Sequence, residues 1–217
     1  MVRVPVLKNI MGANDTIAKE LKEFFSNKGV KVINVLGTPG AGKTSFIEWN
    51  IKQLGDKNRI GVVEGDVASQ VDADRLGKLG IPVVQINTGG SCHLNALMVR
   101  EALKLIDITN LDILFIENVG NLICPANFSL GETLRIVILS VPEGDDKPKK
   151  YPVVFHTVDG VILNKIDVLE AFDYSVSAFQ KEVEKINPNA VFFPVSCKSG
   201  EGLIDWIKWL KENYFIS

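Results

Sequence analysis

The sequence predicts an α/β fold, in which a mostly parallel sheet of roughly seven strands is covered by helices on both faces. Short runs rich in β-branched residues alternate with stretches at helical spacing. The predicted strands are almost continuously apolar, which is typical of parallel strands that helices bury on both sides. With 217 residues, of which 46% are hydrophobic, the chain is long enough for one large core. We therefore expect a single domain over residues 1–217.

The first predicted element is an amphipathic helix from Thr16 to Asn27. Asn14 or Asp15 is the candidate capping residue, and Gly29 lies where the helix is expected to end. The helical spacing is carried by Ile17, Leu21, Phe24 and Phe25. We expect residues 1–29 to form a helical extension that packs on the domain.

The strands and the remaining helices follow in alternation. Strands are predicted at residues 30–36, 59–65, 81–87, 111–118, 133–141, 159–165 and 190–196. Helices are predicted at residues 44–54, 69–79, 94–106, 177–186 and 203–215. The segment PEGDDKPKKYP, at 142–152, is rich in charge and proline and fits neither period. We expect it to be an exposed loop between two strands.

Composition restricts the class of protein. A net charge of −2 argues against a broad electrostatic attraction to nucleic acid or to an anionic membrane, and no local basic patch is evident. The sequence shows no secretory leader and no run close to the roughly 18 apolar residues of a membrane span. Three widely spaced cysteines are too few for a disulfide framework and fit a reducing compartment. We expect a cytoplasmic protein.

Residues 37–44 read GTPGAGKT and match the phosphate-binding pattern G-x-x-x-x-G-K-[ST] in full. The match lies between a predicted strand and a predicted helix, as the pattern requires. Glycines allow successive backbone N–H groups to face a phosphate, and the amino terminus of the helix adds positive charge. Lys43 is expected to reach the terminal phosphates, and Thr44 to bind magnesium. The sequence thus predicts a P-loop NTPase whose loop binds the nucleotide through Gly37, Gly40, Ala41, Gly42, Lys43, Thr44 and Ser45.

Two carboxylates directly follow predicted strands and are candidates for further magnesium ligands. Asp66 ends VVEGD, and Glu117 ends LFIE. Open α/β sheets bind ligands at the carboxyl ends of their strands. We therefore expect Asp66 and Glu117 to bind magnesium and, together with Lys43, to take part in catalysis. Asp72 is a weaker candidate because it also fits an exposed helix position.

Two short elements indicate which nucleotide is bound. Residues 164–167 read NKID and resemble the N-K-x-D element of GTPases, and residues 196–198 read SCK and resemble their S-A-K element, with cysteine in place of alanine. In GTPases the aspartate of the first element accepts hydrogen bonds from the guanine ring, and adenine lacks the matching donors. The resemblance implies GTP rather than ATP. It assigns the base contacts to Asn164, Lys165, Asp167, Ser196, Cys197 and Lys198.

A cluster of soft ligands is expected near the same edge of the sheet. Cys92 and His93 follow one predicted strand, and Cys124 follows the strand that carries Glu117. Thiolate and imidazole suit zinc, copper or nickel, whereas oxygen ligands suit magnesium. A buried cysteine also serves as a small packing residue, so the residues alone leave metal binding and packing as equal alternatives.

The chain is similar, over nearly its whole length, to the HypB family of hydrogenase nickel-incorporation GTPases. The resemblance is carried, in order, by GTPGAGKTS, VVEGD, NTGGSCHLNA, IENVGNLICPA, EGDDKPKKYP and VILNKID. It implies a GTPase that binds GTP and Mg²⁺, with Ni²⁺ or Zn²⁺ at Cys92, His93 and Cys124. It further implies a role in nickel insertion during [NiFe]-hydrogenase maturation, with the hydrogenase large subunit and a second nickel accessory protein as partners.

The number of ligands bears on assembly. A structural zinc site has four protein ligands, and this cluster offers three. Either water completes the site, or a second copy of the chain contributes its own ligands across a two-fold axis. The second option couples metal binding to a GTP-dependent homodimer. We expect GTP and magnesium to order the segments after VVEG and LFIE, so that hydrolysis changes the dimer and the metal site together.

Several other interpretations fit parts of the sequence. The urease accessory GTPase also delivers nickel, but its metal pair is Cys-Pro-His, whereas Cys92 and His93 are adjacent. The GTPase chaperones of cobalamin-dependent mutases have no need of the cysteine and histidine set. A small-molecule kinase, which belongs to a different class, predicts an acceptor pocket and a preference for ATP. Asp146 and Lys147 are candidates for contact with the nucleotide or with the dimer partner, but they fit a solvent-exposed run of charges equally well. His156 is expected to be structural.

Overall fold

The structure is a computed structural model that describes residues 6–54, 59–67 and 71–214, with side chains described from residue 11 onward. Parts of three predicted elements lie outside these ranges. They are the first residues of the amino-terminal extension, the start of the helix predicted at 69–79 and the last residue of the helix predicted at 203–215.

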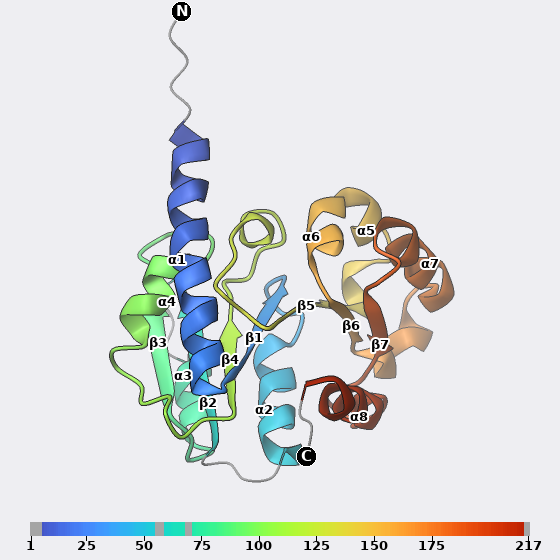
Figure 1. Cartoon of the computed structure of the whole chain (residues 1–217). Coiled ribbons are helices and arrows are strands. Elements are labelled where there is room, and N and C mark those ends of the chain that lie inside the picture. The colour runs from blue at the N-terminus through green and yellow to red at the C-terminus, as the bar shows by residue number, and fades with distance from the viewer. Residues whose placement is uncertain (1–5, 55–58, 68–70, 215–217) are drawn as a thin grey trace, which may run out of the picture.

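Seven strands form one parallel sheet in the order β3-β2-β4-β1-β5-β6-β7, which confirms the predicted fold class (Figure 1). The strands are β1 (Lys31–Gly37), β2 (Ile60–Asp66), β3 (Val83–Asn87), β4 (Ile113–Glu117), β5 (Leu134–Ser140), β6 (Gly160–Asn164) and β7 (Val191–Pro194). The central strand β1 pairs with β4 on one side and with β5 on the other. Because all strands run the same way, their carboxyl ends meet at one edge of the sheet.

Helices cover both faces of the sheet. The α-helices are α1 (Val6–Lys28), α2 (Lys43–Gln53), α3 (Val71–Gly77), α4 (Ala96–Ala102), α5 (Lys147–Lys150), α6 (Pro152–Thr157), α7 (Val176–Ile186) and α8 (Leu203–Tyr214). Short 3₁₀ helices are η2 (Pro125–Asn127), η3 (Val141–Glu143) and η4 (Ile166–Ala171).

Successive residues of β1 alternate between the two faces, as a pleated strand requires. Ile33 and Val35 pack in a cluster with side chains of α2, α3 and α8. On the opposite face, Val32 packs with α1 and α4, and Leu36 packs with α6 and α7. Burial on both sides explains why the strand is almost continuously apolar.

The first helix is longer than predicted. It begins at Val6 rather than at Thr16, so Asn14 lies in its interior and is not a cap. Glycine and asparagine are weak helix formers, and Gly12 and Asn14 interrupt the apolar period there. Asn14 is nevertheless buried and bonded to two distant segments, Ala96 and Ser129. These tertiary contacts outweigh the local propensity.

The prediction of an exposed loop at 142–152 is wrong in part. The segment contains the end of η3, the short helix α5 and the first residue of α6. Pro148 and Pro152 stand in the first turns of α5 and α6, where a proline loses no helical hydrogen bond. Pro148 is buried. The prolines therefore start helices here instead of marking a loop.

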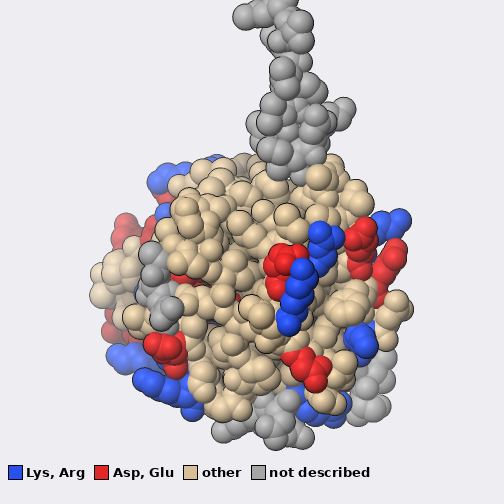
Figure 2. All heavy atoms as spheres, turned by 90° about the vertical axis from the view of Figure 1, so that its left-hand side faces the viewer, with Lys and Arg blue, Asp and Glu red and all other residues tan. Residues whose placement is uncertain are grey.

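The surface carries both signs of charge. On the face shown in Figure 2, basic and acidic side chains are interspersed, in keeping with the small net charge. Among the described residues, no helix combines the length and the apolar character needed to span a membrane.

Candidate functional site

The P-loop connects β1 to α2, as the pattern predicts. Gly40 and Gly42 have positive φ angles of 76° and 99°, which favour glycine. A Cβ atom on Gly42 would collide with the side-chain amide of Asn164. Lys43 is buried, and its Nζ donates to the carbonyl oxygen of Thr38 at 3.2 Å, across the loop. The loop thus has the tight curvature that a phosphate site needs.

The N-K-I-D segment lies directly beside the P-loop. Asn164 donates through Nδ2 to the carbonyl oxygen of Ala41 at 2.9 Å and accepts at Oδ1 from the backbone N–H of Cys197 at 3.0 Å. Lys165 donates to the carbonyl oxygen of Gly40 at 2.7 Å. Asn164 therefore ties three segments together: the P-loop, the end of β6 and the segment after β7.

A pocket of about 520 Å³ opens next to these residues. Asp167 lies in its wall and accepts a hydrogen bond from Ser196 Oγ at 2.7 Å. Among the predicted base contacts, those that line the pocket are Asn164, Lys165, Asp167, Cys197 and Lys198. Ser196 does not line it and instead holds Asp167. The arrangement presents a carboxylate to a base-sized space beside the phosphate loop.

A second pocket, of about 530 Å³, lies on the other side of the P-loop and holds the candidate magnesium ligands. Thr44 donates through Oγ1 to Glu117 Oε1 at 2.9 Å. Asp66 and Asp72 also line this pocket. Burial raises the pKa of Glu117 to about 7, although the Lys43 ammonium and the Thr44 hydroxyl act in the opposite direction. Oε2 of Glu117 has no hydrogen-bond partner among the described residues.

Glu64 is a site residue that the sequence analysis missed. It lies on β2 opposite Glu117 on β4, lines the same pocket, and is 3% exposed. Burial, reinforced by the charges of Glu117 and Asp66, raises the pKa of Glu64 to about 8. Its Oε2 is also without a partner among the described residues. A carboxylate inside an apolar strand, two positions before Asp66, was the signal in the sequence, since alternate strand residues share a face.

These oxygens fit a magnesium ion. Magnesium prefers oxygen ligands and commonly uses one or two carboxylates besides phosphate and water. The Thr44 hydroxyl and the unpartnered oxygens of Glu64 and Glu117 belong to one pocket beside the P-loop. Two neighbouring buried carboxylates repel each other unless a proton or a cation compensates their charge.

Cys92, His93 and Cys124 are brought together. One ligand atom from each lies within 4.8 Å of the others. Two ligand atoms bound to one metal at about 2.3 Å lie at most about 4.6 Å apart, so a small movement would allow all three to bind one ion. Cys92 Sγ is 3.7 Å from His93 Nδ1. The pKa of the Cys124 thiol is raised by its hydrogen bond with the neighbouring Cys92 thiol and by partial burial.

The loop geometry explains why these ligands meet. Gly89 and Gly90 adopt φ angles of 58° and 103°, and this glycine turn reverses the chain after β3. Thr88 donates to the carbonyl oxygen of Ser91 and closes the turn. Asn121, three residues before Cys124, donates to the carbonyl oxygen of Cys92 at 3.3 Å. The two ligand segments are therefore in direct contact.

Other candidate residues lie elsewhere. Asp146 forms an ion pair with Lys150, and Lys147 lies over the ring of Tyr151; neither lines the two pockets beside the P-loop. His156 is not part of the cysteine and histidine cluster. Cys197 belongs to the base pocket and is a free thiol.

The fold and the two pockets define a P-loop NTPase of the α/β class with a separate cluster of soft metal ligands. Residues 31–194 match the model of the family described as CobW/HypB/UreG, nucleotide-binding domain. The chain is 45% identical over 206 residues to the hydrogenase maturation factor HypB of Azotobacter vinelandii, covering 95% of this chain and 68% of that protein.

Two further comparisons concern Helicobacter pylori. The hydrogenase/urease maturation factor HypB of strain ATCC 700392 / 26695 is 42% identical over 219 residues, covering 97% of this chain and 90% of that protein. The crystal structure of HypB from Helicobacter pylori in complex with nickel superposes with a TM-score of 0.88 at 41% identity, covering 93% of this chain and 95% of that chain. The chain belongs to the HypB family of hydrogenase maturation factors.

Proposed function

We propose that this protein is a GTP-hydrolysing metallochaperone that carries nickel for [NiFe]-hydrogenase maturation. Residues 1–217 would act as one P-loop GTPase domain, with residues 1–29 as a helical extension. The observation that carries the proposal is the cluster of Cys92, His93 and Cys124, whose ligand atoms lie within 4.8 Å of one another at the nucleotide edge of the sheet. Membership in a family of hydrogenase maturation factors supports it.

The base pocket supports GTP as the nucleotide. Asp167 would accept hydrogen bonds from the two guanine donors, and Ser196 fixes its orientation. A site built to satisfy those donors disfavours adenine, which offers the Asp167 carboxylate no matching pair of donors. Lys165 would cover the base, and Asn164 braces the P-loop behind it.

Hydrolysis would depend mainly on position and charge. Lys43 and the backbone N–H groups of the P-loop would hold the terminal phosphates. Thr44, Asp66 and Glu117 would hold magnesium, which supplies charge stabilisation when bound. Glu64 adds a fourth oxygen donor at this end of the pocket.

The metal cargo would be nickel or zinc, because two thiols and an imidazole are the donors. Cys92 is exposed, and His93 and Cys124 are half-buried, so the cluster is open to solvent and to another chain. We propose that a second copy completes the ligand set in a GTP-dependent homodimer. A hydrogenase large subunit and a second nickel accessory protein would be the other partners. We propose that this activity takes place in the cytoplasm; the free thiol ligands support this, because a reducing compartment keeps thiols unoxidised.

The test measures nucleotide preference, nickel content and dimer fraction on the same sample. We expect GTP to bind at least about 100-fold more tightly than ATP. We expect dimer fraction and nickel content to differ between the complex with a non-hydrolysable GTP analogue and the complex with GDP. A preference for ATP would contradict the GTPase assignment. If dimer fraction and nickel content were the same in both complexes, the proposed coupling of nucleotide state to dimer and metal would be contradicted.

A further inference from the structure

Two segments carry the three soft ligands. The first metal segment, residues 88–96, contains Cys92 and His93, and the second metal segment, residues 121–131, contains Cys124. Besides the direct hydrogen bond from Asn121 to Cys92, two separate sets of polar contacts join these segments, and the residues that make them are far apart in the sequence.

The first contact set is a single side chain from the amino-terminal helix. Asn14 accepts at Oδ1 from the backbone N–H of Ala96 at 2.8 Å and donates through Nδ2 to the carbonyl oxygen of Ser129 at 2.9 Å. Asn14 is 6% exposed. Both ends of its amide are therefore satisfied by the backbones of the two metal segments.

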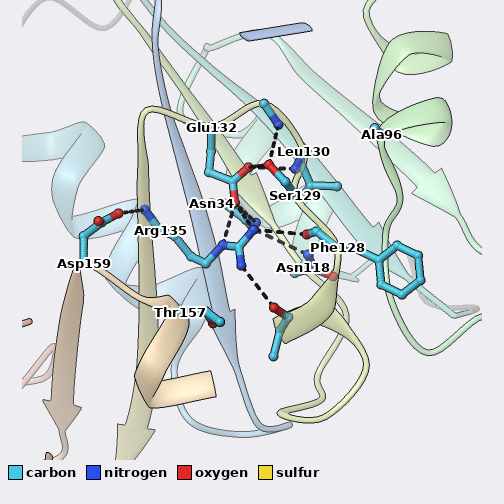
Figure 3. A network of polar contacts seen from close by, with 12 residues as sticks. Asn34, Ala96, Asn118, Phe128, Ser129, Leu130, Glu132, Arg135, Thr157 and Asp159 are labelled. Atoms are coloured by element: carbon cyan, nitrogen blue, oxygen red, sulfur yellow. Dashed lines mark hydrogen bonds and ion pairs between the residues drawn. The ribbon is translucent and has the colours of Figure 1, made fainter. Parts of the chain in front are cut away.

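The second contact set runs beneath the site through the sheet. Asn118, fully buried at the end of β4, accepts at Oδ1 from the backbone N–H of Leu94 at 3.0 Å, next to His93. Its Nδ2 donates to Asn34 Oδ1 at 3.4 Å, and Asn34 Nδ2 donates to Glu132 Oε1 at 3.1 Å. Figure 3 shows Asn34 and Asn118 near the carboxylate of Glu132 and the guanidinium of Arg135.

A largely buried ion pair ends this chain of contacts. Arg135 Nε donates to Glu132 at 2.6 Å, and the guanidinium also donates to the carbonyl oxygens of Ala126 and Phe128, each at 3.2 Å (Figure 3). Glu132 Oε2 accepts from the backbone N–H of Leu130 at 2.7 Å. One carboxylate and one guanidinium thus bond to Ala126, Phe128, Ser129 and Leu130 of the second metal segment.

The placement of these groups is unusual for a structural core. Asn34 is fully buried in the middle of the central strand, in a run of otherwise apolar residues. An apolar side chain at this position would avoid the free-energy cost of removing a polar amide from water. A fully bonded polar network instead selects one arrangement of the segments that it joins. One end of this network lies on the backbone next to His93, and the other on backbone between two and six positions after Cys124.

We propose that Asn14 and Asn118 are positioning residues that fix the two metal segments relative to each other and so preset the spacing of Cys92, His93 and Cys124. The proposal rests on the metal site of the proposed function. Groups around a metal site that hold its ligands typically change metal affinity by about 10–100-fold when they are removed. Asn118 also follows Glu117 directly, so the same residue joins the magnesium pocket to the first metal segment.

The test compares Asn14→Ala and Asn118→Ala with the control Asn187→Ala in the full chain. Asn187 likewise donates to two backbone carbonyl oxygens, of Phe155 and Val158, but its side chain bonds to neither metal segment. Nickel affinity is measured by competition with a chromophoric chelator, together with thiolate-to-nickel charge-transfer absorption and thermal stability. We expect Asn14→Ala and Asn118→Ala to weaken nickel binding about 10-fold or more and to change the absorption. The control should lose stability only.

Two outcomes would overturn the positioning role. One is nickel affinity and absorption at wild-type level in both Asn14→Ala and Asn118→Ala. The other is an equal loss of nickel affinity in Asn187→Ala, which would trace the effect to general destabilisation. The double variant Cys92→Ala/Cys124→Ala separates this inference from the proposed function. If that variant retains nickel, the metal site itself is wrong; if it loses nickel while the asparagine variants keep it, only the positioning role is wrong.

Discussion

The imidazole of His93 lies against the ring of Phe128, with ring centroids 4.1 Å apart and an angle of 35° between the planes. The contact joins the two metal segments directly, in addition to the polar contacts made by Asn14 and Asn118. Burial lowers the pKa of His93, which favours the neutral imidazole that binds metal ions. The contact with Phe128 therefore orients the imidazole of His93, and its burial favours the neutral form that the proposed metal site needs.

Phe128→Ala should raise the pKa of His93, because removal of the ring admits water to the imidazole. A titration of the imidazole protons by NMR measures this directly, and His156, the other histidine, serves as the internal reference. Nickel binding should weaken most at about pH 6, where a more basic imidazole is more protonated. Phe24→Ala, at an exposed phenylalanine of α1, is the control. An unchanged His93 pKa in Phe128→Ala would contradict the role of the ring.

Thr44→Val should reduce Mg²⁺-dependent GTP hydrolysis by roughly 100-fold, because it removes the hydroxyl proposed to bind the ion and leaves Glu117 without its donor. Steady-state hydrolysis measured over a range of Mg²⁺ concentrations tests this. Thr157→Val is the matched control, since Thr157 donates only to the carbonyl oxygen of Val154 in α6. Equal Mg²⁺ dependence in the two variants would argue against Thr44 as a ligand.

Asp167→Asn should change the base preference from guanine to xanthine. The carboxylate fits two donors, whereas an amide offers a donor to the additional carbonyl oxygen of xanthine. We expect GTP affinity to fall by about 100-fold or more and XTP affinity to rise. Equilibrium titration with both nucleotides provides the measurement, and Asp205→Asn, at an exposed position of α8, is the control. If GTP still bound more tightly than XTP to Asp167→Asn, the base pocket would be misassigned.

Glu132→Gln should make the free energy of unfolding depend less on pH in the acidic range. Although burial alone raises the pKa of Glu132, the Arg135 guanidinium and hydrogen bonds from Asn34 and Leu130 outweigh it and hold the pKa below its ordinary value. A depressed carboxyl pKa adds stability above the pKa of the unfolded chain, about 4.3, and this is lost as the pH falls through the folded pKa.

The difference in unfolding free energy between wild type and Glu132→Gln should therefore be largest near neutral pH, at roughly 3–5 kcal/mol for a broken buried pair. It should shrink below about pH 4. Urea unfolding at a series of pH values measures both quantities. A difference that stays constant from about pH 7 to about pH 3 would show that the ion pair does not supply this stability.

Local patterns predicted those features that depend on local chain geometry. The P-loop and the strand alternation each follow from residues close together in the sequence. The position of Asn164 beside Gly42 was also predictable, because both residues belong to recognisable motifs. These features needed no knowledge of how distant segments meet.

The missed residues act through distant contacts. Asn14 contacts Ser129, which lies 115 positions away, and the same residue looked like a helix cap from its neighbours alone. Asn118 is one of several polar residues after β4, and nothing nearby shows that Leu94 will approach it. Glu64 gave a clearer signal, as a carboxylate in an apolar strand. That Glu64 lies opposite Glu117 became evident only from the register of β2 and β4.

The most direct test of the nickel site measures nickel bound per chain in three proteins: wild type, Cys92→Ala/Cys124→Ala and Cys197→Ala. Cys197, the third free cysteine, is the matched control because it lies in the base pocket and outside the cluster. We predict that wild type and Cys197→Ala bind nickel with equal stoichiometry and that the double variant binds none. Stoichiometric nickel in the double variant would contradict the assignment of Cys92, His93 and Cys124 as the metal site.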